Sequence, residues 1–183
     1  MPLRPTPARE DTMLNWLKNQ TLHNWSSAPI VNDGETIIDA TAAQIYEKLD
    51  FATPLNAYRE RGYVFGAGNP AYDIFEATDP GEPGKTLIFE VTEARPGKRY
   101  CYRTTIRDAD ADCPVIESSS EYTIIPQKDG RQLLHLQESS VLASGLNRHA
   151  YILERAKLNF SVFRTLARLR LHLELGTDLR DIN

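Results

Sequence analysis

The sequence predicts an α+β fold, in which a curved antiparallel sheet wraps around a long C-terminal helix. Between residues 85 and 143, runs rich in β-branched and aromatic residues alternate with turns at Gly97 and Gly130, a pattern typical of an antiparallel meander. A long helical segment follows from Asn147 to Gly176, where glycine stands at a common helix end. Because such a meander needs cover for its apolar face, we expect this helix to lie across the sheet.

Local signals place the individual elements. Apolar and polar residues alternate from residue 34 to 40, and Thr41 is then a natural N-cap. The expected elements are an N-terminal helix from Asp11 or Thr12 to Trp25, a strand over 34–40, helices over 42–50 and from Pro54 toward Arg61, strands over 72–77, 85–94, 98–107, 115–126 and 131–143, and the last helix over 147–176.

Composition limits the class of protein. With 183 residues one domain is expected, and 41% hydrophobic and 25% charged residues are ordinary for a globular protein. The net charge of −4 argues against nucleic acid as a partner, and no apolar run is long enough to span a membrane. Cys101 and Cys113 are expected as free thiols in a reducing compartment, and no secretory signal is recognisable. We therefore expect a cytoplasmic location.

Several motif-like stretches lack the residues that their chemistry requires. Gly84-Lys85-Thr86 precedes a predicted strand, whereas a phosphate loop must lead into a helix. Asp108, Asp110 and Asp112 have the spacing of calcium ligands, but the glycine and glutamate that complete such a loop are absent. The four histidines lack zinc-binding spacing. We therefore expect no metal and no cofactor.

Strand phase predicts a pocket between the sheet and the last helix. Side chains alternate between the two faces of a strand, and we take the faces that carry few charges as the inner ones. The residues expected to contact a ligand are Phe89, Tyr100, Tyr102, Ser120, Tyr122, Leu136, Phe160 and Phe163. This composition is typical of a pocket for a small hydrophobic or aromatic molecule, for which we expect a volume of about 300 Å³ or more.

Glu138 is the main candidate for a catalytic residue. It shares the inner phase of its strand, and a carboxylate that faces an apolar cavity should have a raised pKa. Beside the hydroxyl of Tyr102 it could act as a general acid or base. Two alternatives stay open. Glu138 could reach water or pair with Arg148 at the strand end, and the tyrosines could be ordinary core residues.

The last helix carries more apolar residues than one packed face needs. We expect one stripe to face the sheet, and a surplus to pack on the N-terminal helix or on another chain. The expected sheet-facing stripe is Ile152, Ala156, Phe160, Phe163, Ala167 and Leu171, and the surplus includes Leu158, Leu166, Leu169 and Leu173. Trp16 and Trp25 of the N-terminal helix need burial, which favours cover within the chain. A monomer and a homodimer both stay open.

Three stretches resemble a known superfamily. They are Ile38-Asp-Ala-Thr-Ala-Ala-Gln-Ile-Tyr-Glu-Lys-Leu49, Phe89-Glu-Val-Thr-Glu-Ala-Arg-Pro-Gly-Lys-Arg-Tyr-Cys-Tyr-Arg103 and Glu121-Tyr-Thr-Ile-Ile-Pro-Gln-Lys-Asp-Gly130. In this order they are similar to the START/Bet v 1-like (SRPBCC, polyketide cyclase/dehydrase and lipid transport) superfamily. The resemblance implies a helix-grip fold with a ligand cavity. It implies a domain over residues 29–176, preceded by an extension (1–28) that holds a helix and followed by a tail (177–183).

Three functions agree with these observations. The first is a carrier or binding protein for a small hydrophobic or aromatic ligand. The second is a cofactor-independent cyclase, dehydratase or isomerase that acts on a polyketide-like or aromatic substrate. The third is a protein interaction module. A dry cavity would favour the carrier, an acid/base pair at the cavity would favour the enzyme, and a filled core with an exposed apolar patch would favour the interaction module.

Overall fold

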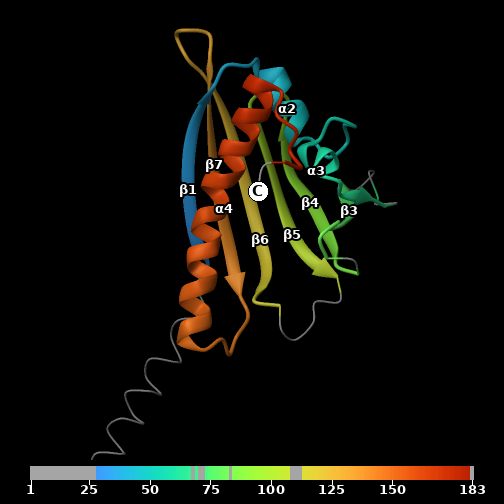
Figure 1. Ribbon diagram of the computed structural model, residues 1–183, viewed down its shortest axis with the longest axis vertical. Coiled ribbons are helices and arrows are strands. Elements are labelled where there is room, and N and C mark those ends of the chain that lie inside the picture. Colours follow the sequence, from blue (N-terminus) through green and yellow to red (C-terminus); the bar gives the residue numbers. More distant parts are fainter. Residues whose placement is uncertain (1–27, 67–68, 70–72, 83, 108–112, 182–183) are drawn as a thin grey trace, which may run out of the picture.

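The computed structural model describes residues 28–66, 69, 73–82, 84–107 and 113–181. It shows one seven-stranded antiparallel sheet in the order β1-β7-β6-β5-β4-β3-β2, with the long helix α4 across one face (Figure 1). The strands are β1 (Ile30–Ile38), β2 (Val64–Phe65), β3 (Ile74–Thr78), β4 (Thr86–Arg95), β5 (Arg99–Arg107), β6 (Val115–Pro126) and β7 (Gln132–Leu142). The helices are α2 (Ala42–Leu49), α3 (Ala57–Glu60) and α4 (Arg148–Leu175). The predicted α+β class is therefore confirmed.

The meander is formed by consecutive hairpins, and β1 extends it. Gly97 and Gly130 stand in the β4–β5 and β6–β7 turns with φ of 68° and 89°, a backbone conformation that glycine adopts without strain. β1 pairs with β7 from Ile30 opposite Ser140 to Ile38 opposite Gln132. The first strand along the chain therefore lies beside the last one, and α4 packs against both.

Two element boundaries differ most from the sequence prediction, one because of strand pairing distant in sequence and one because of a local helix cap. β1 begins at Ile30 rather than at residue 34, because its first residues pair with β7. The second short helix begins at Ala57 rather than Pro54, since the Asn56 side chain accepts a hydrogen bond from the Tyr58 N–H and caps it. The expected helix from residue 11 to Trp25 lies outside the described residues. Cys101 and Cys113 are free thiols, as predicted.

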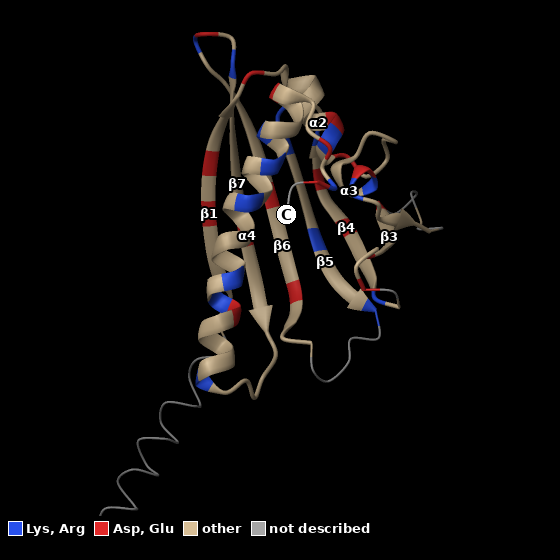
Figure 2. Cartoon of the chain, viewed as in Figure 1, with Lys and Arg blue, Asp and Glu red and all other residues tan. Residues whose placement is uncertain are grey.

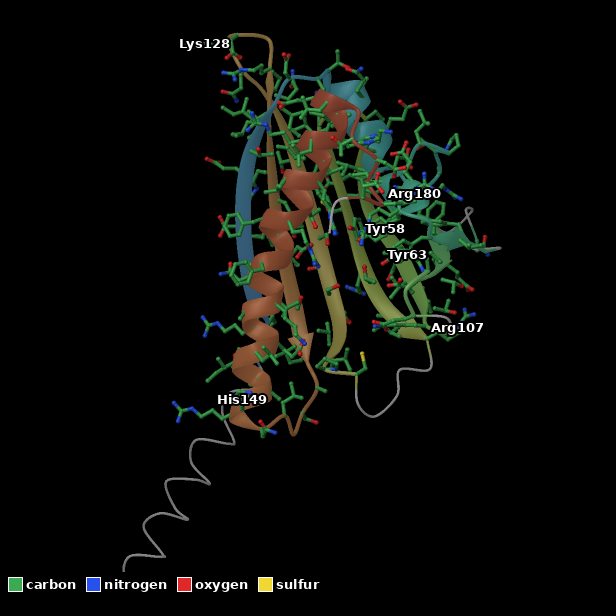
Figure 3. The ribbon with its side chains drawn as sticks, viewed as in Figure 1. Tyr58, Tyr63, Arg107, Lys128, His149 and Arg180 are labelled. Carbon is green, nitrogen blue, oxygen red and sulfur yellow. The ribbon has the colours of Figure 1, made fainter. Side chains whose placement is uncertain are left out.

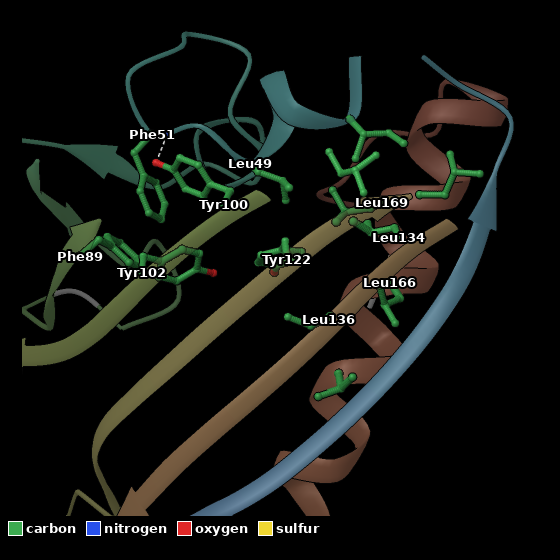
Figure 4. Close-up of a cluster of buried hydrophobic side chains, with 14 of the residues drawn as sticks. Leu49, Phe51, Phe89, Tyr100, Tyr102, Tyr122, Leu134, Leu136, Leu166 and Leu169 are labelled. Atoms are coloured by element: carbon green, nitrogen blue, oxygen red, sulfur yellow. Dashed lines mark hydrogen bonds between the residues drawn. The ribbon is translucent and has the colours of Figure 1, made fainter. Parts of the chain in front are cut away.

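Aromatic rings fill the core under α2 and α3. Phe51 is fully buried, and its ring stacks on that of Phe89 with centroids 4.5 Å apart (Figure 4). Tyr100 and Tyr102 meet the Phe51 ring edge-on at 5.8 and 4.9 Å. The Tyr100 hydroxyl accepts a hydrogen bond from the Phe51 N–H at 3.0 Å, which satisfies a buried backbone donor. The predicted inward phase of β4 and β5 is confirmed by this burial, but the rings occupy the space that was expected to be a cavity.

The face of α4 that packs on the sheet is not the predicted one. Val162, Leu166 and Leu169 are buried against the sheet, whereas Phe160 is 72% exposed and Phe163 54% exposed. A Cβ atom on Gly34 of β1 would come within 3.0 Å of Val162 Cγ1, so the helix and the strand approach closely there. The helix carries two apolar stripes, and its periodicity cannot tell which of them the sheet will bury. Within the described chain no helix is long and apolar enough to cross a membrane.

Candidate functional site

The candidate site is a pocket between the sheet, α3, α4 and the segment that follows α4. Its volume is about 40 Å³. It is lined by Lys48, Leu49, Ala57, Tyr58, Arg61, Tyr102, Tyr122, Thr165, Arg168, Leu169 and Leu179. The expected volume of about 300 Å³ is therefore wrong for this conformation, because the aromatic core side chains fill most of the concave face of the sheet.

Buried phenol hydroxyls meet at the sheet side of the pocket. The hydroxyls of Tyr58 and Tyr102 lie 3.3 Å apart, and Tyr102 also interacts with Tyr122 and with Ser120. Burial raises the pKa of Tyr58, Tyr102 and Tyr122 well above the usual value for a phenol, so all three stay neutral at any physiological pH. A neutral phenol can both donate and accept a hydrogen bond, so this cluster can bind a carbonyl or hydroxyl oxygen.

Two arginines flank these phenols. The Arg61 guanidinium lies 5.7 Å from the ring centroid of Tyr58 and 5.4 Å from that of Tyr63. Figure 3 labels these two tyrosines. Burial lowers the pKa of Arg168, and the positive charges of Arg61 and Arg164 lower it further. Positive charge is thus concentrated at the pocket, and Figure 2 shows further Lys and Arg positions along α4. An acidic group bound between Arg61 and Arg168 would relieve their mutual repulsion.

Lys48 also lines the pocket, but its charge is already compensated. Its Nζ lies 2.6 Å from Glu60 Oε1, and both side chains are largely buried. Glu60 Oε2 in turn lies 3.1 Å from His172 Nε2 of α4. Within the described residues, Arg61 has no such carboxylate partner, which distinguishes it from Lys48 as a group available to a ligand.

The segment after α4 closes the pocket from outside. Leu179 is only 3% exposed and lines the pocket directly. The Thr177 carbonyl lies 2.8 Å from His172 Nδ1, and the Asp178 carboxylate pairs with Arg180. Residues 177–181 of the predicted tail therefore fold back over the site.

Glu138 stands near the phenols but does not line the pocket. Its Oε2 accepts a hydrogen bond from the Ser161 hydroxyl of α4 at 2.8 Å. Burial raises the pKa of Glu138, and the hydrogen bond from Ser161 opposes that rise. Its charge also contributes to the raised pKa values of Tyr58, Tyr102 and Tyr122. Its hydrogen-bond partner in the described chain is Ser161, and no ion pair joins it to Arg148.

The structure separates the predicted site residues into three groups. Tyr102 and Tyr122 line the pocket. Phe89, Tyr100, Ser120 and Leu136 are buried in the core around it. Phe160 is largely exposed and does not line the pocket, and Phe163 lies outside the pocket, with its ring Cε1 3.4 Å from where a Cβ on Gly34 of β1 would stand.

Sequence analysis missed Tyr58, Arg61, Arg168 and Leu179 as pocket residues. Tyr58 lies on a helix of four residues, Ala57–Glu60, and Leu179 lies on a segment without regular structure, so periodicity gave no sign of either. The arginines of α4 alternate with apolar residues, and such a pattern is common on solvated helix faces. Only the phase of α4 on the sheet turns Arg168 toward the pocket.

The described residues contain no group of three or more His, Cys, Asp or Glu side chains that could hold a metal ion.

Comparison with known proteins finds likeness in structure only. No protein-family model matches the chain, and no curated protein matches it. DynU16, a protein of the dynemicin biosynthetic locus, superposes with a TM-score of 0.60 at 17% identity over 82% of this chain. The chain spans about half of DynU16, 49% of its length.

Two further solved structures share the architecture. A conserved protein from Geobacillus kaustophilus has a TM-score of 0.55 at 16% identity, covering 78% of this chain and 94% of its own. Ara h 8.0201 has a TM-score of 0.50 at 11% identity, covering 74% and 93%. At these identities the likeness concerns the fold alone, a curved antiparallel sheet with a long C-terminal helix across it.

Proposed function

We propose that this chain binds a small aromatic molecule that carries an acidic group, in the pocket between the sheet, α3 and α4. One observation carries the proposal: neutral phenols gather on one side of the pocket and two arginines stand beside them. Aromatic walls with a few convergent polar groups are typical of small-molecule sites. An arginine recognises a carboxylate, sulfonate or phosphate through its planar set of donors.

The pocket must open to admit such a molecule. A volume of about 40 Å³ holds water rather than a ring system, and small-molecule sites generally measure about 300–1,000 Å³. The segment that follows α4 is the element best suited to move, because its described residues, 176–181, contain neither helix nor strand and contribute one large apolar side chain, Leu179, to the pocket. Ligand binding would therefore displace Leu179.

A second candidate function is acid/base catalysis without a cofactor. The raised pKa of Glu138 and the nearby phenols support it, because burial favours the protonated carboxyl group, which can act as a general acid. We favour the carrier because Glu138 bonds to Ser161 and does not line the pocket.

Two fluorescent dyes that differ by one acidic group test the binding proposal. They are 8-anilinonaphthalene-1-sulfonate, which is anionic, and N-phenyl-1-naphthylamine, which is neutral. We expect Arg61→Gln to raise the dissociation constant of the anionic dye about tenfold or more, since a hydrogen bond to a charged group contributes about 1.5–3 kcal/mol. The dissociation constant of the neutral dye should change by less than about twofold in the same variant. Leu179→Ala should increase the affinity for both dyes, because the smaller side chain leaves part of the pocket empty.

Two control variants locate the dye. Arg155→Gln removes a positive charge from an exposed position of α4, and Phe160→Ser removes the most exposed large ring of that helix. Neither should change the affinity for either dye. If Leu179→Ala leaves the affinity for both dyes unchanged, or if Phe160→Ser abolishes binding, the pocket is not the binding site and the proposal fails. Equal loss of both dyes on Arg61→Gln would refute the recognition of an acidic group.

A further inference from the structure

Helix α4 presents a second apolar stripe beside the face that packs on the sheet, and Phe163 of this stripe reaches the edge of β1, where its Cε1 lies 3.4 Å from the position of a Cβ on Gly34. Ile152, Phe160, Phe163 and Leu171 are 50%, 72%, 54% and 38% exposed. Ala156 and Ala167 fall between them at helical spacing, and both are exposed. We call these six residues the outer stripe. With a rise of 1.5 Å per residue, it extends for about 29 Å along the helix.

A continuous exposed stripe of this kind marks a surface that is covered in the working protein. The ring of Phe160 and about half of the ring of Phe163 would otherwise stand in water, although burial of such rings is among the strongest driving forces in folding. Another side of α4 already covers the sheet, through Val162, Leu166 and Leu169. The outer stripe therefore belongs to a further layer.

The same chain contains a segment whose apolar side chains and point of attachment suit the outer stripe. Residues 1–27 precede the described part of the chain, and they contain both of its tryptophans, Trp16 and Trp25, together with Met13 and Leu17. Ile30, the first residue of β1, pairs with Ser140 near the end of β7, and α4 begins soon after that strand. The N-terminal segment therefore joins the sheet beside the first half of α4, where the outer stripe starts (Figure 1).

The length of the segment also fits. The sequence predicts a helix over residues 11–25, which at 1.5 Å per residue would be about 22 Å long. Only a few residues separate Trp25 from Ile30, so the helix must end close to Ile152. It can then follow the stripe only by running back toward Leu171, antiparallel to α4.

We propose that residues 11–25 pack as a helix along the outer stripe of α4, antiparallel to it, and form a third layer on the sheet and α4. The occupant is this segment of the same chain rather than a second copy, because its attachment beside β1 gives it a high local concentration at the stripe. The inference rests on the exposed residues of α4 and on the chain that precedes β1. It does not depend on ligand binding in the pocket.

Intrinsic tryptophan fluorescence of the full chain tests this directly, because both tryptophans lie in the proposed segment. We expect the native protein to emit at shorter wavelength than the urea-unfolded protein and to be poorly quenched by acrylamide. The double variant Phe160→Lys with Phe163→Lys should shift the emission toward that of the unfolded protein, and its quenching constant should rise about twofold or more. Arg155→Gln, at an exposed polar position of α4, should change neither quantity.

Two further measurements make every outcome decisive. Circular dichroism should show that the double variant still unfolds cooperatively, since both rings are exposed in the described structure. Light scattering should show a monomer over a hundredfold range of protein concentration. The wavelength of the tryptophan emission should stay the same over that range. Native emission equal to that of the unfolded protein would overturn the proposal. A short-wavelength emission that disappears on dilution together with a dimer would assign the outer stripe to a second copy, and would also overturn it.

Discussion

Replacing Tyr100 with phenylalanine tests how the aromatic core holds the pocket. The Tyr100 hydroxyl accepts a hydrogen bond from the Phe51 N–H at 3.0 Å, and both side chains are almost wholly buried. Tyr100→Phe keeps the ring and its contacts but leaves this buried donor without its partner. An unsatisfied buried group of this kind costs about 1–3 kcal/mol. The total free energy of unfolding of a domain is only about 5–15 kcal/mol, so the loss should be readily measurable.

The assay is equilibrium unfolding in urea, followed by circular dichroism. With a slope of about 1–3 kcal/mol per molar for a protein of this size, the midpoint of Tyr100→Phe should fall by about 0.5–1.5 M, and the slope should stay unchanged. Because Phe51 packs against Tyr58 of the pocket at 5.8 Å, the same variant should also weaken dye binding.

Tyr46→Phe is the matched control. Its ring meets that of Tyr100 edge-on at 5.6 Å, and its side chain is half-buried. We expect its free energy of unfolding to match that of the wild type within about 0.5 kcal/mol, as is usual away from buried networks. If Tyr100→Phe unfolds at the same urea concentration as the wild type, the N–H of Phe51 has another acceptor and the reasoning about this hydrogen bond is wrong.

Two further variants test Glu138 and the contact between β1 and α4. The raised pKa of Glu138 means that the folded state holds its proton more tightly than the unfolded chain, so stability falls as pH rises through the folded pKa. Glu138→Gln should therefore melt above the wild type at pH 8, with the difference shrinking toward pH 4; a constant difference would refute this. Gly34→Ala would place a Cβ 3.0 Å from Val162, so it should destabilise by about 1–3 kcal/mol. Gly66→Ala, where nothing lies within 4 Å, should be nearly neutral, and equal effects would contradict the close approach.

Much of the fold followed from local signals. The strand over residues 115–126 has its predicted bounds, because β-branched and aromatic residues fill it and a Lys-Asp-Gly turn follows it. The last helix begins within one residue of its predicted start, where the Asn147 side chain accepts a hydrogen bond from the Ala150 N–H. The inward phase of Phe89, Tyr100 and Tyr102 was also predicted, since side chains alternate strictly along a strand.

What the sequence determined by itself was therefore the class of fold, the order of its elements and the inner faces of the central strands, because these depend on residues close together in the chain. Tertiary structure alone decided which stripe of α4 meets the sheet, since both stripes have helical spacing and only the packed structure shows that Val162, Leu166 and Leu169 are the buried residues. It also decided the pocket. Tyr58, Arg168 and Leu179 come from three separate segments, and no local pattern could bring them together. Packing between distant segments filled the expected cavity and left the outer stripe of α4 exposed.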